Sequence, residues 1–108
     1  FQITWTVSIM HRATGVAMMV GLLLLTAWFL SAAFSKDLFL IIDTFLQSWV
    51  GIIVISGSLW AFWFHFLNGV RHLFWDAGYG FDLETVARSG WTVVVGSIVL
   101  TISSFLVL

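Results

Sequence analysis

The chain has 108 residues, of which 61% are hydrophobic and only 8% carry a charge, and its formal net charge is −1. Soluble domains contain about 25% charged residues, so this sequence cannot cover a globule with water-facing side chains and belongs to the membrane class. The small net charge gives no electrostatic basis for binding nucleic acid, and the lack of cysteine excludes disulfides and iron–sulfur ligation by this chain.

Three long stretches without Asp, Glu, Lys or Arg follow one another along the chain, at residues 13–35, 44–70 and 89–108. A helix needs about 20 mostly apolar residues to cross the hydrocarbon core, so each stretch is long enough to span a membrane. The sequence therefore predicts an all-α membrane protein, a single transmembrane anchor domain over residues 1–108 with three transmembrane helices in an up-down-up bundle. We expect these helices at about residues 6–33, 45–75 and 84–108.

The two links between the predicted helices differ in character. Residues 34–44 are mostly apolar, and we expect them to lie along the membrane interface as a turn of helix. Residues 76–83 form a polar loop with glycines suited to turns, and Asp82 is placed to cap the third helix.

The basic residues predict the orientation in the membrane. Arg12, Arg71 and Arg88 fall on one side of the predicted bundle, and Lys36 alone falls on the other. Because Lys and Arg are enriched on the cytoplasmic side, we expect the N-terminus and the 76–88 loop to face the cytoplasm or the mitochondrial matrix.

The first polar cluster is SIMHRATG, residues 8–15, near the start of the first predicted helix. Ser8, Arg12 and Gly15 share one helix face, with His11 on its flank. A hydroxyl, a guanidinium and an imidazole there could hold a ligand that carries carbonyl oxygens or carboxylates. Alternatively, Arg12 and His11 reach lipid phosphates and Ser8 caps the helix.

The second polar cluster is HFLNGVRHLFWDAG, residues 65–78, at the end of the second predicted helix. His65 and His72 share a face, and Gly69 between them leaves room for a flat ligand. A deep imidazole needs a partner, and haem iron is one that suits a membrane, with Arg71 and His72 at the level of the propionates. The alternative is a core histidine bonded to a backbone carbonyl or a serine. With three histidines in the chain, a second haem ligand would have to come from another subunit.

The two clusters, in this order and on three spans, resemble the cytochrome b membrane-anchor subunit of succinate dehydrogenase (respiratory complex II). That family carries Ser-x-x-His-Arg-x-x-Gly at the opening of its first helix and His-x-x-x-Gly-x-Arg-His-x-x-x-Asp at the end of its second. Here they stand as SIMHRATG and HFLNGVRHLFWD. The resemblance covers nearly the whole chain and implies the same three-helix anchor fold.

The resemblance implies a haem b shared with a second, smaller anchor subunit. His65 matches the axial ligand of the haem iron, and a histidine of the smaller subunit is the opposite ligand. The groups expected around the haem propionates and the quinone pocket are His11, Arg71 and His72.

The resemblance also implies a site for ubiquinone. Ser8 and Arg12 match residues that bind the quinone, and Asp76 matches an acidic residue at the rim, although a solvated carboxylate paired with an arginine is the plainer interpretation of Asp76. Succinate oxidation belongs to a flavoprotein subunit and an iron–sulfur subunit, so this chain is expected to be a non-catalytic-core part of the enzyme. The expected setting, with membrane lipid as a further partner, is the bacterial inner membrane or the mitochondrial inner membrane.

Three other functions fit a three-helix membrane chain. A haem-free structural anchor would need neither cluster, and a fumarate reductase anchor would use the same fold for the reverse reaction. A transporter subunit would need polar side chains along a path through the midplane. The third predicted helix offers Thr101, Ser103 and Ser104 there, which we expect to bond to their own helix.

Overall fold

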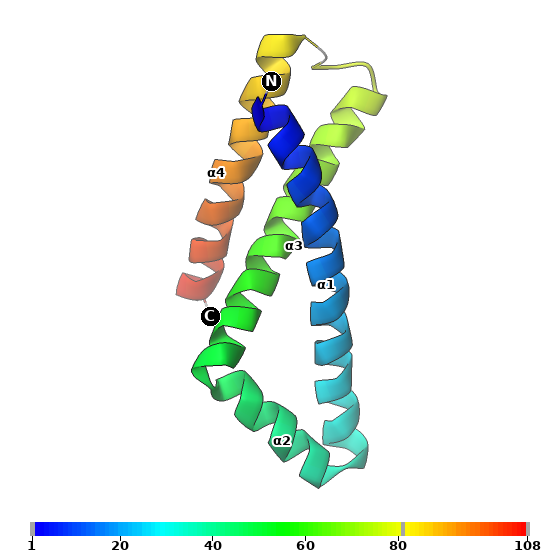
Figure 1. The fold of residues 1–108 in the computed structure, drawn as a ribbon, viewed down its shortest axis with the longest axis vertical. Helices are drawn as coiled ribbons and strands as arrows, with labels where there is room; N and C mark the ends of the chain where they lie inside the picture. The colour runs from blue at the N-terminus through cyan, green and yellow to red at the C-terminus, as the bar shows by residue number, and fades with distance from the viewer. Residues whose placement is uncertain (1, 81, 108) are drawn as a thin grey trace.

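The computed structural model describes residues 2–80 and 82–107, and this part of the chain forms four α-helices. Figure 1 shows α1 descending, α2 crossing the lower end, α3 returning to the level of the N-terminus and α4 descending again. The prediction of an all-helical protein with three long apolar helices is confirmed. The helices are α1 (Gln2–Phe34), α2 (Lys36–Gln47), α3 (Trp49–Asp76) and α4 (Leu83–Val107).

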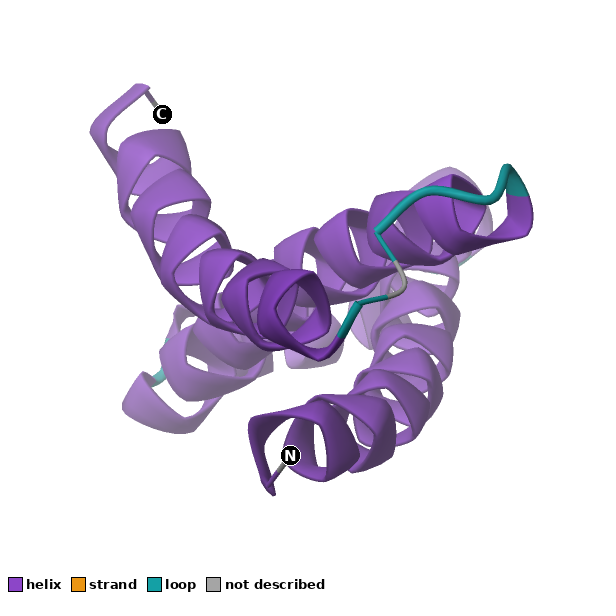
Figure 2. Ribbon diagram, turned by 90° about the horizontal axis from the view of Figure 1, so that it is seen from above, coloured by secondary structure: helices purple, strands orange, loops and turns teal. Residues whose placement is uncertain are grey.

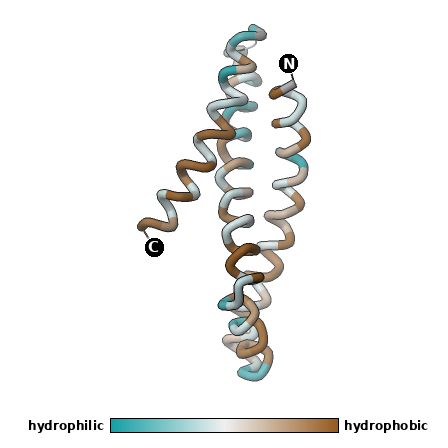
Figure 3. Tube along the Cα trace, turned by 60° about the vertical axis from the view of Figure 1, so that its left-hand side comes forward, coloured by the Kyte–Doolittle hydropathy of each residue, from teal (hydrophilic) through white to brown (hydrophobic). Residues whose placement is uncertain are grey.

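Three segments are long and apolar enough to cross a membrane: Trp5–Phe34, Trp49–Asp76 and Glu84–Val107. Most of their large apolar side chains point away from the bundle, as with Leu23 at 66% exposure and Val107 at 87%. Outward apolar side chains are expected where lipid is the solvent. In Figure 3 the trace of α4 toward the C-terminus is coloured mostly as hydrophobic.

The helix α3 is the centre of the bundle, with α1 on one side and α4 on the other. The buried apolar core is small and gathers Val7 of α1, Phe64 of α3 and Val93 of α4. Seen from above, α4 leans away from the other helices toward the C-terminus (Figure 2). Close packing is therefore concentrated at the end of the bundle that holds the start of α1, the end of α3 and the start of α4.

The link that was expected at 34–44 is a twelve-residue helix, α2, with no buried side chain in it. Ser35 caps its start by accepting a hydrogen bond from the backbone N–H of Leu38 at 3.3 Å. The chain then turns sharply at Ser48, whose backbone is extended (φ −73°, ψ 166°) and whose hydroxyl accepts from the N–H of Gly51 at 3.2 Å. The helix α3 therefore begins at Trp49, where the sequence had indicated a start near residue 45.

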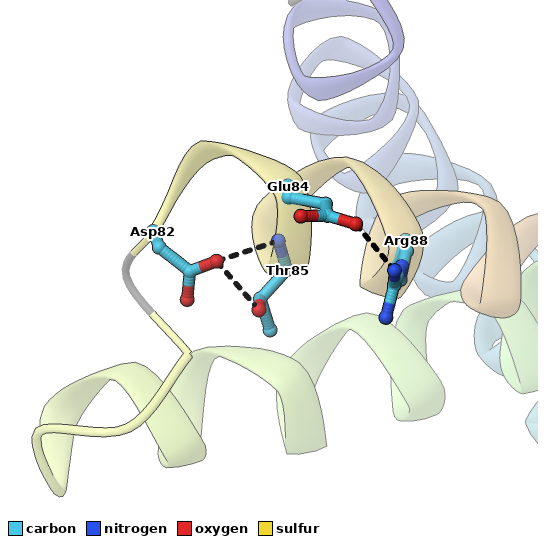
Figure 4. Close-up of polar contacts among 4 residues, drawn as sticks. All are labelled: Asp82, Glu84, Thr85 and Arg88. Carbon is cyan, nitrogen blue, oxygen red and sulfur yellow. Dashed lines mark hydrogen bonds and ion pairs between the residues drawn. The ribbon is translucent and has the colours of Figure 1, made fainter.

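The turn between α3 and α4 uses glycine and an acidic cap. Gly78 and Gly80 have positive φ angles of 90° and 75°, which L-residues with side chains rarely adopt. Asp82 caps α4 by accepting hydrogen bonds from the backbone N–H of Thr85 at 3.2 Å and from its hydroxyl at 2.9 Å (Figure 4), as the sequence predicted. These bonds hold the pKa of the Asp82 carboxyl below its ordinary value.

Candidate functional site

Three imidazoles meet between α1 and α3, near the end of the bundle that holds the N-terminus. The rings of His11 and His65 are stacked, with centroids 3.9 Å apart and planes at 10°. The ring of His72 lies 5.6 Å from that of His11 and is tilted by 51°. The antiparallel return of α3 therefore brings the two polar clusters of the sequence together in space.

His65 is anchored to α1 through one ring nitrogen. Its Nδ1 lies 3.2 Å from the backbone oxygen of His11 and 3.4 Å from the hydroxyl of Thr14. A carbonyl oxygen only accepts, so we assign the proton to Nδ1, which leaves the lone pair on Nε2 free. This carbonyl contact is the plain alternative that the sequence had left open, and it occupies only one of the two ring nitrogens.

Thr14 supports that contact, although sequence reasoning gave it no role. It is buried, and its hydroxyl donates to the same His11 carbonyl at 3.0 Å. Thr14 therefore donates a hydrogen bond to the same backbone oxygen that His65 contacts. A hydroxyl three residues after His11 was visible in the sequence, but its burial depends on where α3 packs against α1.

Two glycines set the space around the imidazoles. A Cβ at Gly15 would lie 3.2 Å from Cε1 of His65, so this glycine lets the imidazole approach the α1 backbone. A Cβ at Gly69 would meet none of the described side chains within 4 Å. The space beside Gly69 is therefore open, as a flat ligand edge-on to α3 would require. At Gly15, the group that comes close to the α1 backbone is the imidazole of His65.

Ser8, Arg12, His72 and Asp76 are all exposed. Ser8 and Arg12 have no hydrogen-bond partner among the described residues, and neither does Asp76. Their polar atoms are consequently available to a ligand or to another subunit. They lie toward the same end of the bundle as the stacked imidazoles, because α1 begins where α3 ends (Figure 1).

Arg71 lies on a different side of α3, facing α4. It is 5% exposed, and its Nε donates to the hydroxyl of Ser89 at 2.8 Å. Its two terminal nitrogens donate to the side-chain oxygen of Asn68 at 3.1 Å and to the backbone oxygen of Val86 at 3.0 Å. Its guanidinium carbon also lies 4.3 Å above the ring centre of Trp75. These contacts hold α3 against α4, and sequence spacing had not revealed the partners on α4.

The site does not hold a metal by protein ligands alone. Within residues 2–80 and 82–107, no group of three or more His, Cys, Asp or Glu side chains is arranged to bind an ion. The face-to-face stack of His11 on His65 also leaves no room for a porphyrin between these two rings. A metal at Nε2 of His65 would therefore need its other ligands from a cofactor and from a second chain.

The sequence of the chain matches one protein family over nearly its whole length. Residues 1–103 match the model of the succinate dehydrogenase/fumarate reductase transmembrane subunit family. The succinate dehydrogenase cytochrome b556 subunit of Paracoccus denitrificans is 43% identical over 100 residues, which cover 93% of this chain and 77% of that protein. The b556 subunit of Rickettsia conorii is 38% identical over 101 residues, covering 94% and 78%. The cytochrome b560 subunit of Reclinomonas americana is 32% identical over 111 residues, covering 98% and 77%.

Proposed function

The chain belongs to the family of succinate dehydrogenase/fumarate reductase transmembrane subunits, as a cytochrome b membrane-anchor subunit of succinate dehydrogenase, and we propose that it binds haem b through His65 and forms part of a ubiquinone-reduction site. It is an integral membrane protein with three spans. It serves the enzyme as an anchor, while succinate oxidation is assigned to the flavoprotein and iron–sulfur subunits.

The observation that carries the haem proposal is the hydrogen bonding of His65. Histidines that bind metals usually donate the other ring N–H to a carboxylate or backbone carbonyl, which orients the ring and fixes its tautomer. Here Nδ1 meets the carbonyl of His11 at 3.2 Å, and Nε2 is left for iron. The open space beside Gly69 would admit a porphyrin edge. When bound, a b-type haem supplies a one-electron carrier.

The haem would be shared with a second chain. His11 would not serve as a further ligand, because its ring is stacked on that of His65. A histidine of a second, smaller anchor subunit would supply the remaining protein ligand. His11 and His72 are suited to the propionates. The same role for Arg71 stays a prediction. Two observations do not favour it: Arg71 bonds to α4, and the step of six residues along the helix from His65 turns its side chain about 120° away from that imidazole.

Ser8 and Arg12 are the residues that we assign to ubiquinone. They lie one turn apart on one face of α1, and both are exposed. Each can donate a hydrogen bond to a quinone carbonyl oxygen, and the Arg12 guanidinium stabilises negative charge that develops there during reduction. Reduction to the quinol needs two electrons and two protons. The iron–sulfur subunit supplies the electrons, and the exposed carboxyl of Asp76 is placed to pass protons from the aqueous side.

The orientation follows from the basic residues. The start of α1 and the turn between α3 and α4 lie at the same end of the molecule (Figure 1), and Arg12, Arg71 and Arg88 lie toward that end, with Lys36 at the opposite end. We assign this end to the cytoplasm or matrix, where the iron–sulfur and flavoprotein subunits would dock. The membrane is a bacterial inner membrane or a mitochondrial inner membrane.

A reduced-minus-oxidised spectrum of the purified complex tests the haem proposal. The His65→Ala complex should lose the b-type absorption that the wild-type complex shows. An unchanged spectrum in an assembled His65→Ala complex would exclude His65 as a ligand, and no b-type absorption in the wild type would favour a haem-free structural anchor.

The quinone proposal is tested by comparing two activities of the same complex. Ser8→Ala and Arg12→Leu should each lower succinate-dependent quinone reduction, while reduction of an artificial dye by the soluble subunits persists. Equal loss of both activities would indicate failed assembly and count against a role in quinone binding. Rates of succinate oxidation and fumarate reduction measured side by side decide the physiological direction.

A transporter function is not favoured by the third span. The hydroxyl of Thr101 donates to the backbone oxygen of Ser97 at 2.7 Å, and that of Ser104 donates to the oxygen of Leu100 at 2.8 Å. Two of the three hydroxyls therefore bond to their own helix as expected from the sequence, and the same bond for Ser103 stays a prediction. Ser104 also accepts from the indole N–H of Trp63 at 3.0 Å, so it serves packing between helices.

A further inference from the structure

A cavity lies between α3, the following turn and α4, on the side of α3 that faces away from the imidazoles. Its volume is about 460 Å³, which is within the range of small-molecule sites. None of His11, His65 and His72 lines it. The lining residues that matter most for its chemistry are Arg71, Trp75, Tyr79, Ser89, Val70 and Val93.

The buried positive charge of Arg71 has no negative partner in the described residues. Its three side-chain hydrogen bonds go to a serine hydroxyl, an amide oxygen and a backbone carbonyl, which are all neutral. The ion pair formed by the described residues joins Arg88 to Glu84, on the exposed face of α4. A charged group so far out of water is usually paired, and ionisable residues within membrane helices commonly mark ligand sites.

The guanidinium still has donors to offer a ligand. Arginine carries five N–H donors in a planar fork, and three of them serve the bonds within the chain. The fork geometry suits the oxygen atoms of phosphate. The charge and the spare donors together favour an anion over a neutral carbonyl compound.

The cavity also changes from polar to apolar along its length. Tyr79 and Ser89 lie toward the turn between the helices, and Leu67, Val70 and Val93 lie deeper. Thr92 also lines the deeper part, but its hydroxyl is bonded to the backbone oxygen of Arg88 at 2.8 Å. Leu67 is about 12 Å of helix rise from Trp75, which is long enough for a head group followed by several methylene groups. Phe74 and Tyr79 at the rim are 59% and 67% exposed, so the cavity opens to the outside of the bundle.

We propose that this cavity binds an anionic phospholipid, with the phosphate at Arg71 and an acyl chain along Leu67, Val70 and Val93. The apolar depth of the cavity favours a lipid over an acidic side chain of a partner subunit, which would leave that depth unfilled. The full buried charge favours phosphate over the neutral head of ubiquinone. The lipid would complete the packing between α3 and α4 at the membrane face.

The experiment uses the purified complex and introduces a larger side chain that occupies part of the cavity. Val70→Phe places an aromatic ring in the apolar part and leaves the hydrogen bonds of Arg71 intact. Its matched control is Val95→Phe, because Val95 does not line the cavity but lines a neighbouring groove on α4 of about 380 Å³, which shares Thr92 with the cavity and has no arginine in its lining. Phospholipid per complex is measured by phosphorus assay and mass spectrometry after exhaustive washing in dodecyl maltoside.

We expect the Val70→Phe complex to retain one phospholipid fewer than the wild type, and the Val95→Phe complex to retain the same number as the wild type. The Arg71→Gln complex, if it assembles, should also retain one phospholipid fewer than the wild type. If it does not assemble, the phospholipid content of the Val70→Phe complex alone tests the proposal. Phosphatidylglycerol added back in micelles should raise the thermal midpoint of the washed wild-type complex, whereas dioleoylglycerol or inorganic phosphate should not. Phosphatidylglycerol should leave the thermal midpoint of the Val70→Phe complex unchanged.

Equal phospholipid content in the wild type and Val70→Phe would overturn the proposal. Loss of ubiquinone in place of phospholipid would do the same, as would protection by dioleoylglycerol or by inorganic phosphate alone. A photo-crosslinker at Tyr79 that captures a partner subunit rather than lipid would assign the cavity to that subunit. The b-type spectrum should be unchanged in Val70→Phe, and its loss would place the cavity within the haem site instead.

Discussion

Replacing Thr14 by valine tests how the chain orients the proposed haem ligand. The substitution keeps the shape of the side chain and removes the hydroxyl that donates to the His11 carbonyl at 3.0 Å and lies 3.4 Å from Nδ1 of His65. A hydrogen bond contributes a net of about 1 kcal/mol, and the second contact is too long to add much. We therefore expect haem to dissociate about fivefold faster or bind about fivefold more weakly in Thr14→Val.

The assay is haem retention per complex during dilution in detergent, together with the electron paramagnetic resonance spectrum of the oxidised haem, which reports the relative orientation of the axial ligands. Thr14→Ser, which keeps the hydroxyl, is the matched control and should behave as the wild type. If Thr14→Val and wild type retain haem equally and share one resonance spectrum, Thr14 does not act through His65. If Thr14→Ser and Thr14→Val are equally impaired, the methyl packing of Thr14 matters rather than its hydroxyl.

Two further predictions concern the turns. Gly51→Ala should prevent the complex from accumulating in the membrane, because the new Cβ would lie 2.1 Å from the backbone oxygen of Phe45. The control is Gly57→Ala, whose Cβ would meet no atom of another segment within 4 Å among the described residues and which should assemble normally. Normal assembly of Gly51→Ala would show that α2 and α3 do not meet so closely. Asp82 should stabilise the start of α4 at neutral pH, and the benefit should fade as the pH falls. Because bonds from Thr85 lower its folded pKa, the contribution is complete above the unfolded value of about 3.9 and is lost as the pH falls through the folded value. The difference in thermal midpoint between wild type and Asp82→Ala should be constant from pH 7 to 5 and shrink below about pH 4; a difference that instead grows on acidification would contradict the cap.

The three spans could be predicted from the sequence because their signal is long and redundant. Each needs about 20 residues free of charge, so no single residue decides it. The extent of α2 could not be predicted in the same way. Its apolar residues run on into the second span, and the break depends on the extended backbone of Ser48 and on the close approach allowed by Gly51. Such local backbone features leave little trace in hydropathy.

The chemistry of the site was predictable by residue type, but the partner of each residue was not. Spacing placed His65 and His72 on one face of a helix, and the antiparallel topology brought that face to His11. Spacing could not show that α4 would supply the Ser89 hydroxyl to Arg71, because that depends on how α4 packs, and the acidic residue of α4, Glu84, pairs with Arg88 instead. The buried role of Thr14 was hidden for the same reason.

The stretch from Phe64 to His72 has two faces, offset by a single residue. Positions 64, 68 and 71 are buried in the bundle, while positions 65, 69 and 72 are half-buried or exposed. One residue of helix is about 100° of rotation, so the same two turns can pack against α4 through Arg71, which also bonds Asn68, and present imidazoles at α1. Inserting or deleting one residue between Phe64 and His72 would rotate one set out of place relative to the other. The bonds of Arg71 with α4 and the packing of Phe64 in the core therefore set the rotation of α3 about its own axis, and that rotation decides where Nε2 of His65 points.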